Sequence, residues 1–193
     1  MKKLLLLFFI LSISAFMSCD DDVPEEEQST EIITRVRLLF SPAGGGAPIV
    51  VDALDADGLG PGLVASGQIN LQSGESYELF ISLENRLTDE DITEEVRLES
   101  NEHMLFFGFS SDLFESPDGD GNLEDRAASV NYLDQDANNL PLGLITSWIA
   151  GDNASSGNFR IVLKHQPDGI KTATSESTEG ATDIDVTWPI AVD

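Results

Sequence analysis

The chain has 193 residues and a formal net charge of −25, from 10 Lys and Arg against 35 Asp and Glu. The phosphates of nucleic acids and anionic lipid surfaces repel such a chain, so both are excluded as partners of the folded part. A cation is the partner that this charge favours. The length suits one domain with a hydrophobic core. The single cysteine, Cys19, excludes an internal disulfide.

Residues 1–18 have the features of a secretory signal peptide. Two lysines precede an apolar stretch, residues 4–17, that is too short for the ~20 residues of a membrane-spanning helix. Its length is typical of the apolar region of a signal peptide. The three residues before Cys19, "FMS", resemble the lipobox of bacterial lipoproteins, in which the cysteine is acylated after the signal is removed. We therefore expect Cys19 to carry acyl chains that anchor the protein in a membrane.

An acidic tether, residues 19–30, is expected to follow the signal peptide. Like charges in "DDDVPEEE" keep such a segment extended. Asp20, Asp21 and Asp22 also resemble the export signal that sends lipoproteins of some diderm bacteria to the outer leaflet. In other bacteria an aspartate directly after the cysteine retains a lipoprotein at the inner membrane. The long acidic run favours an outer-membrane lipoprotein exposed at the cell surface, and a periplasm-facing one is the alternative.

From Glu31 onward, apolar residues recur at every second position, which is typical of half-buried strands. Nine short runs separated by Gly, Asp, Asn and Pro predict strands at residues 31–40, 47–54, 66–71, 76–85, 103–109, 128–133, 142–149, 159–165 and 182–190. This pattern predicts an all-β fold over residues 31–193, a single antiparallel β-sandwich of the Ig-like or jelly-roll-like kind. In the last run, alternation places Thr182 on the apolar face together with Ile184, Val186 and Trp188.

One segment, "TDEDITEEVRLES", has helical spacing instead. Thr88 suits a helix cap, and Ile92 and Val96 are four residues apart. We therefore expect one short helix that connects two strands.

The two histidines of the chain lie at the ends of two predicted strands. His103 opens "HMLFFGF" and His165 closes "FRIVLKH". If these strands are antiparallel neighbours with the histidines opposite each other, Leu105 faces Leu163, Phe107 faces Ile161 and Phe109 faces Phe159, with Cβ atoms ~5 Å apart. Two imidazoles so placed, with a carboxylate, suit a divalent transition metal. The candidate carboxylates are Glu99, Glu102, Asp183 and Asp185. The alternative is that both histidines simply border the core.

Two loops carry oxygen ligands at alternate positions, as a calcium site does. The first has Asp118, Asp120, Asn122 and Glu124, and the second has Asp134, Asp136 and Asn138. Neither loop is an EF-hand, because the first lacks the glycine at position six and both lack the glutamate at position twelve. Ordinary Asp- and Asn-rich turns explain the same pattern.

Several segments, "ITEEVRLESNEHMLFF", "LPLGL", "LKHQPDG" and "TDIDVTWPI", resemble a family of small acidic bacterial outer-membrane lipoproteins. This family is often labelled "type 1 periplasmic binding fold superfamily protein", and the resemblance covers most of residues 31–190. It implies an outer-membrane lipoprotein that serves a TonB-dependent uptake receptor.

The sequence contains no catalytic motif, and we expect a protein that is not an enzyme. The first hypothesis is a cell-envelope lipoprotein that binds a cation or a metal-bearing nutrient. The alternative is a structural or adhesive surface module that recognises carbohydrate or protein through exposed aromatic residues such as Trp148 or Trp188.

Overall fold

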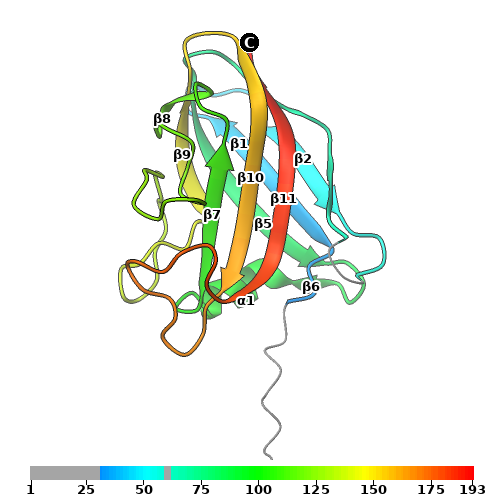
Figure 1. The fold of residues 1–193 in the computed structure, drawn as a ribbon. Coiled ribbons are helices and arrows are strands. Elements are labelled where there is room, and N and C mark those ends of the chain that lie inside the picture. Colours follow the sequence, from blue (N-terminus) through cyan, green and yellow to red (C-terminus); the bar gives the residue numbers. More distant parts are fainter. Residues whose placement is uncertain (1–30, 59–61) are drawn as a thin grey trace, which may run out of the picture.

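The computed structural model describes residues 31–58 and 62–193, which form two β-sheets packed face to face (Figure 1). The larger sheet has the order β3-β2-β1-β5-β9-β8, with β6 paired to β5, and the smaller has the order β4-β11-β10-β7. The strands are β1 (Arg35–Pro42), β2 (Ile49–Leu54), β3 (Val64–Ser66), β4 (Ile69–Leu71), β5 (Ser76–Asn85), β6 (Glu90–Asp91), β7 (His103–Phe109), β8 (Phe114–Ser116), β9 (Ile145–Ala150), β10 (Ser155–His165) and β11 (Ala181–Val192). All strand pairs are antiparallel except β4–β11. The predicted all-β sandwich is confirmed.

The predicted strands agree with the structure where apolar residues alternate regularly over a long run. The predictions are wrong where the alternating run is short. β5 and β7 have the predicted bounds. The prediction for residues 128–133 is wrong, because Tyr132 forms only an isolated bridge with Thr146. The run at 66–71 is divided between β3 and β4, and the three-residue β8 was not predicted.

The predictions for residues 1–30 lie outside the described residues. They are the signal peptide, the acylated Cys19 and the export signal at Asp20, Asp21 and Asp22. Within the described part, no helix has the length and apolar character needed to cross a bilayer.

The one helix among the described residues, α1 (Ile92–Leu98), begins later than predicted. Its cap is Asp91, whose carboxylate accepts a hydrogen bond from a backbone amide of the first turn, and not Thr88. Thr88 instead donates its hydroxyl to Glu90 at 2.6 Å. Because Glu90 and Asp91 pair with the end of β5, the helix starts only after them. Ile92 and Val96 are buried, as their spacing predicts.

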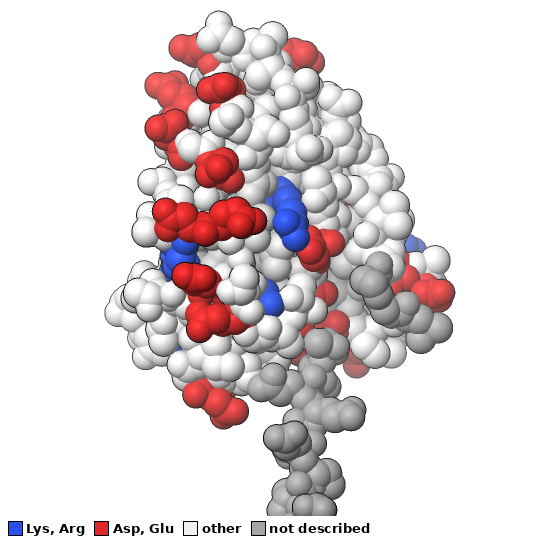
Figure 2. All heavy atoms as spheres, in the orientation of Figure 1, with Lys and Arg blue, Asp and Glu red and all other residues white. Residues whose placement is uncertain are grey.

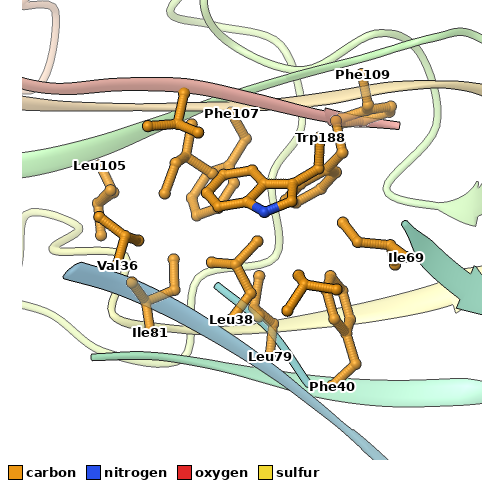
Figure 3. Packing of buried hydrophobic residues seen from close by; sticks show 14 of the residues in the cluster. Val36, Leu38, Phe40, Ile69, Leu79, Ile81, Leu105, Phe107, Phe109 and Trp188 are labelled. Atoms are coloured by element: carbon orange, nitrogen blue, oxygen red, sulfur yellow. The ribbon is translucent and has the colours of Figure 1, made fainter. Parts of the chain in front are cut away.

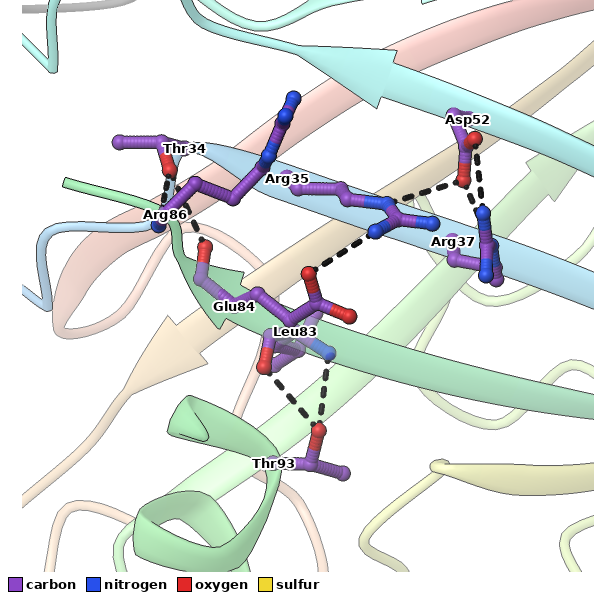
Figure 4. Close-up of polar contacts among 8 residues, drawn as sticks. All are labelled: Thr34, Arg35, Arg37, Asp52, Leu83, Glu84, Arg86 and Thr93. Atoms are coloured by element: carbon purple, nitrogen blue, oxygen red, sulfur yellow. Dashed lines mark hydrogen bonds and ion pairs between the residues drawn. The ribbon is translucent and has the colours of Figure 1, made fainter. Parts of the chain in front are cut away.

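A hydroxyl group attaches α1 to the larger sheet (Figure 4). Thr93 Oγ1 accepts a hydrogen bond from the amide of Leu83 and donates one to the same residue's carbonyl, at 2.9 and 3.1 Å. On the outer face of this sheet, Arg35 and Arg37 both contact Asp52, and Arg35 also reaches Glu84. The two hydrogen bonds of Thr93 hold α1 against β5. The carbonyl of Glu99, directly after the helix, contacts His103 of the smaller sheet.

The core lies between the two sheets (Figure 3). Val36, Leu38 and Phe40 of β1, with their neighbours on β5, pack against Phe107 and Trp188 of the smaller sheet. Both indoles, Trp148 and Trp188, have no exposed surface. Burial of both tryptophans weakens the adhesive alternative, for which they were two examples of exposed aromatic residues.

The edge of the smaller sheet at β7 is covered, and both faces of the strand are buried. On the outer face, Met104 and Phe106 form a second cluster beneath Tyr132. Gly121, whose φ is 90°, forms a β-bridge with Gly108 of β7. A Cβ at residue 121 would collide with the carbonyl of Phe107. The loop can approach the strand this closely because residue 121 is glycine. The loop therefore covers β7, so the sheet has no open edge at this strand.

Candidate metal centre

The two histidines lie directly opposite each other on adjacent strands. β7 and β10 pair with His103 opposite His165, followed by Leu105 with Leu163, Phe107 with Ile161 and Phe109 with Phe159. This is the register expected from the sequence. The two rings are stacked, with centroids 4.6 Å apart and planes 7° from parallel.

The hydrogen bond of His103 fixes which of its nitrogens can bind a cation. Nδ1 lies 3.2 Å from the carbonyl oxygen of Glu99. Because a carbonyl only accepts, Nδ1 carries the proton and Nε2 has a free lone pair. Nε2 is buried and has no hydrogen-bond partner within residues 31–58 and 62–193. The nearest charged group, Oδ2 of Asp183, is 3.7 Å away, which is beyond hydrogen-bonding distance.

A β-bulge brings Asp183 to this position. Leu163 pairs with Ile184, but the next residue of β10, Lys164, pairs with Thr182, so Asp183 is an extra residue on β11. The predicted alternation is therefore wrong at Thr182, which is exposed and accepts a hydrogen bond from Lys164 Nζ at 2.7 Å. A bulge changes the face to which the side chains before it point. The carboxylate of Asp183 consequently has no exposed surface and lies beside His103.

Three of the four candidate carboxylates lie with the histidines. Glu99 follows α1, and one of its oxygens together with one nitrogen from each histidine forms a set within 4.8 Å. Glu102 Oε2 is 3.3 Å from His165 Nε2, and Asp183 faces His103. Asp185 does not belong to this group, because Arg160 binds both its oxygens at 2.7 Å near the surface. We call Glu99, His103, His165 and Asp183 the histidine cluster.

Burial governs the proton affinities in the cluster. Desolvation lowers the pKa of His103 to about 4, although the carbonyl of Glu99 and the charge of Glu102 oppose the shift. Desolvation also raises the pKa of Asp183 to about 6. At pH 7 His103 is therefore neutral, which is the form that binds metals, and Asp183 is ionised. A buried carboxylate beside a free imidazole lone pair lacks a cation.

The sequence did not identify two further acids near the cluster, Glu31 and Glu95. Burial raises the pKa of Glu31 to about 7, and hydrogen bonding and charge repulsion from Glu95 contribute further, with smaller effects from Glu99 and Asp183. Glu95 and Glu99 are four residues apart on the predicted helix segment, a spacing that places both on one face. That spacing could have identified Glu95 as a neighbour of Glu99. Glu31 lies before the first strand, and no sequence pattern placed it near the cluster.

The basic residues nearest the cluster are already engaged. Lys171 Nζ donates to the carbonyl of Ser100 at 2.7 Å and forms an ion pair with Asp136 at 2.9 Å, with both side chains fully buried. Lys164 donates to Thr182 on the outer face. Neither lysine forms an ion pair with Asp183. Acidic side chains also greatly outnumber basic ones on the visible surface (Figure 2).

In the second loop proposed for calcium, the carboxylates already have partners. Asp134 accepts from the amides of Gly143 and Leu144 at 2.8 and 2.9 Å. Asp136 accepts from the amides of Asn138 and Leu140 in addition to its ion pair. These contacts are those of tight turns.

In the first loop, the oxygen ligands do not converge. Asn122 is buried, accepts from the amide of Phe107 and donates to Tyr132. Asp118, Asp120 and Glu124 are exposed. Calcium binding at either loop stays a prediction.

No family model matches the chain, and no curated protein or solved structure is significantly similar to it.

Proposed function

We propose that this protein is a non-catalytic cell-envelope lipoprotein that binds one divalent transition metal at the histidine cluster. The observation that carries the proposal is the unpartnered Nε2 lone pair of His103 facing the buried, unpartnered carboxylate of Asp183. Two hydrogen-bond acceptors buried face to face are costly unless a cation joins them. His165, which stacks on His103, and Glu99 lie close enough to provide a second imidazole and a second carboxylate. Zinc, copper and nickel all bind these two kinds of ligand.

The distances support a metal at this place. For an ion about 2.1 Å from both Nε2 of His103 and Oδ2 of Asp183, which are 3.7 Å apart, the Nε2–ion–Oδ2 angle would be about 125°. Neighbouring ligand atoms in a tetrahedral zinc site lie roughly 3.4 Å apart. The ligand atoms of Glu99, His103 and His165 lie within 4.8 Å of one another, so these three side chains would draw together by roughly 1 Å to reach tetrahedral spacing.

Titration of the purified protein with zinc, copper and nickel tests the site. We expect one site for which His103→Ala and His165→Ala each lower affinity at least ~10-fold. Asp183→Asn should weaken binding, whereas the matched control Asp185→Asn should not, because Asp185 belongs to Arg160. Affinity should fall below about pH 6, where Asp183 takes up a proton. Equal binding by the double histidine variant would show that the acidic surface merely collects cations.

The envelope location and a TonB-dependent receptor as partner are parts of the same proposal. They rest on the lipobox-like segment, on the acidic tether and on the family resemblance. Cys19→Ala should abolish incorporation of labelled palmitate, and equal labelling of variant and wild type would refute lipidation. Replacing Asp20, Asp21 and Asp22 by alanine should reduce cleavage by external protease on intact cells. Unchanged cleavage would leave these residues as a linker.

A further inference from the structure

The outer face of the larger sheet carries a row of apolar side chains. In its centre, Leu39 of β1 lies opposite Phe80 of β5. Val50 of β2 flanks Leu39, and Ile145 of β9 flanks Phe80. Leu133 continues the row, because its amide donates to the carbonyl of Ile145 at 2.9 Å. We call these five residues the apolar row. With neighbouring strands about 4.8 Å apart, it is about 19 Å long.

Much of this apolar surface is exposed. Three members of the apolar row are between 38% and 53% exposed, and the other two are half-buried. Leu54 of β2 and Val64 of β3, which lie opposite each other on the same face, are 38% and 69% exposed. Five of the nine large apolar side chains that are exposed in residues 31–58 and 62–193 therefore lie on one face. Such a concentration marks a surface that contacts another protein.

The charges on this face nearly cancel (Figure 4). The outward positions of β1, β2, β5 and β9 carry two basic and three acidic residues, a net charge of −1, in a chain whose net charge is −25. Arg35 and Arg37 pair with Asp52, and Arg35 also pairs with Glu84. One acid, Glu78, is in excess. On the surface above the smaller sheet, in contrast, acidic side chains greatly outnumber basic ones (Figure 2).

This distribution of charge favours a second copy of the chain as the partner. A strongly basic protein would be attracted to the acidic surfaces and not to the nearly neutral one. A second copy has the same large negative charge, so two copies repel each other least when their nearly neutral faces meet. Packing of two sheets through apolar side chains is also the arrangement that forms the core within each copy.

A two-fold axis makes the face complementary to itself. If the axis runs between β1 and β5, roughly along the strands, Leu39 of each copy packs on Phe80 of the other. The same axis brings Arg35 of one copy towards Glu84 of the other, because these residues lie at the same level of the two strands. Apolar contacts at the centre and opposite charges at one end are therefore satisfied by a single arrangement.

We propose that the outer face of the larger sheet is the interface of a homodimer in which the apolar rows of two copies pack against each other. Four strands about 4.8 Å apart and the eight residues of β1 give a flat area of about 500 Å² per copy. Stable interfaces bury about 800 Å² per partner, so this dimer is weak and reversible. The proposal goes beyond the metal function and uses no residue of the histidine cluster.

The test is sedimentation velocity of the mature protein in density-matched detergent, with micelles in excess over protein. We expect a monomer at about 1 µM and mostly dimer at about 300 µM, as a weak interface of this size implies. Raising sodium chloride from about 0.05 M to about 0.5 M should strengthen dimerisation, because salt screens the repulsion between the acidic surfaces. A monomer at about 300 µM in both salt concentrations would overturn the proposal. A dimer that weakens with salt would also overturn it, since ion pairs and not the apolar row would then hold the copies together.

Matched serine variants show whether the apolar row forms the interface, and they leave the charge unchanged. Phe80→Ser should weaken dimerisation about 10-fold or more, because it removes the large side chain at the centre of the interface. Leu98→Ser, which alters a side chain on α1 that is 76% exposed, should leave dimerisation unchanged. If both variants weaken it equally, or neither does, the copies associate through another surface and the proposal is wrong.

Two controls separate this interface from the fold and from the metal centre. Fluorescence of the buried tryptophans reports whether Phe80→Ser is folded. Val50→Ser, a smaller change at an exposed position of the same row, should weaken dimerisation about 3-fold and gives the answer if Phe80→Ser unfolds. Zinc affinity should be equal in Phe80→Ser and wild type, whereas His103→Ala should lower zinc affinity and leave dimerisation unchanged. Each proposal can therefore fail alone.

Discussion

Asp183→Asn in the metal-free protein should change how stability depends on pH. The carboxyl group of Asp183 has an ordinary pKa of 3.8, which burial raises to about 6 in the folded state. The folded protein therefore carries a cost of about 3 kcal/mol above pH 6, which shrinks as the pH falls towards 3.8. Between pH 3.8 and about 6 the folded protein binds more protons at Asp183 than the unfolded chain does. The contribution of Asp183 to the free energy of unfolding therefore falls as the pH rises.

His103 has the opposite dependence. Burial lowers its pKa from 6.5 to about 4, so the unfolded chain takes up a proton at a pH where the folded protein does not. Stability from this group is lost as pH falls from 6.5 to about 4, and the full loss is about 3 kcal/mol. Between pH 7 and pH 5 the relief at Asp183 is about 1 kcal/mol and the loss at His103 is about 2 kcal/mol. These two contributions nearly cancel each other, and Glu31, whose pKa is also raised, adds stability on acidification in wild type and variants alike.

Urea unfolding of a soluble form that begins at residue 29, at pH 7 and pH 5 with chelator, measures this balance. Both buried tryptophans report unfolding through their fluorescence. On acidification from pH 7 to pH 5, Asp183→Asn should lose about 1 kcal/mol more of its free energy of unfolding than wild type does, because the variant lacks the relief at Asp183. Asp185→Asn, with its exposed partner Arg160, should behave like wild type. If Asp183→Asn and wild type show the same pH dependence, Asp183 does not titrate in this window and the argument fails.

Two further predictions concern the loops beside the cluster. Lys171→Met should lower the free energy of unfolding by about 3–5 kcal/mol, because it leaves the carboxylate of Asp136 buried without its ammonium partner. The double variant with Asp136→Asn should recover part of that loss in urea unfolding, and a harmless Lys171→Met would contradict the buried ion pair. Because amides and Lys171 already satisfy Asp134 and Asp136, the melting temperature of the metal-free protein should not respond to added calcium. A calcium-dependent rise that disappears in Asp118→Ala plus Asp120→Ala would instead establish a calcium site.

Regular alternation explains why the central strands could be predicted from the sequence. In β5, Tyr77, Leu79 and Leu83 are buried at the expected period of two. The pairing of β7 with β10 could be anticipated because a slip by one residue would turn the apolar set of either strand away from the core. The stacked histidines follow from that register, since each is the terminal member of its alternating set.

Contacts with distant segments account for what could not be predicted. Alternation in β7 says that Met104 and Phe106 point away from the core, yet both are buried beneath Tyr132, which lies more than twenty residues further along the chain. The cap of α1 moved from Thr88 to Asp91 because β6 took the intervening residues into the sheet. In both cases a contact with a distant segment determined the structure, and the local sequence pattern did not.

The bulge at Asp183 shows this limit most clearly at the site itself. The run "TDIDVTW" alternates without a glycine or other local mark of an extra residue. With unbroken alternation, Asp183 would share the exposed face of β11 with Asp185, next to the ammonium group of Lys164. His103 Nε2 would then face no carboxylate. One unpaired residue exchanges the faces of Thr182 and Asp183, and it places a carboxylate beside the imidazole lone pair of His103. The proposed metal site therefore depends on a backbone irregularity that residue types alone do not encode.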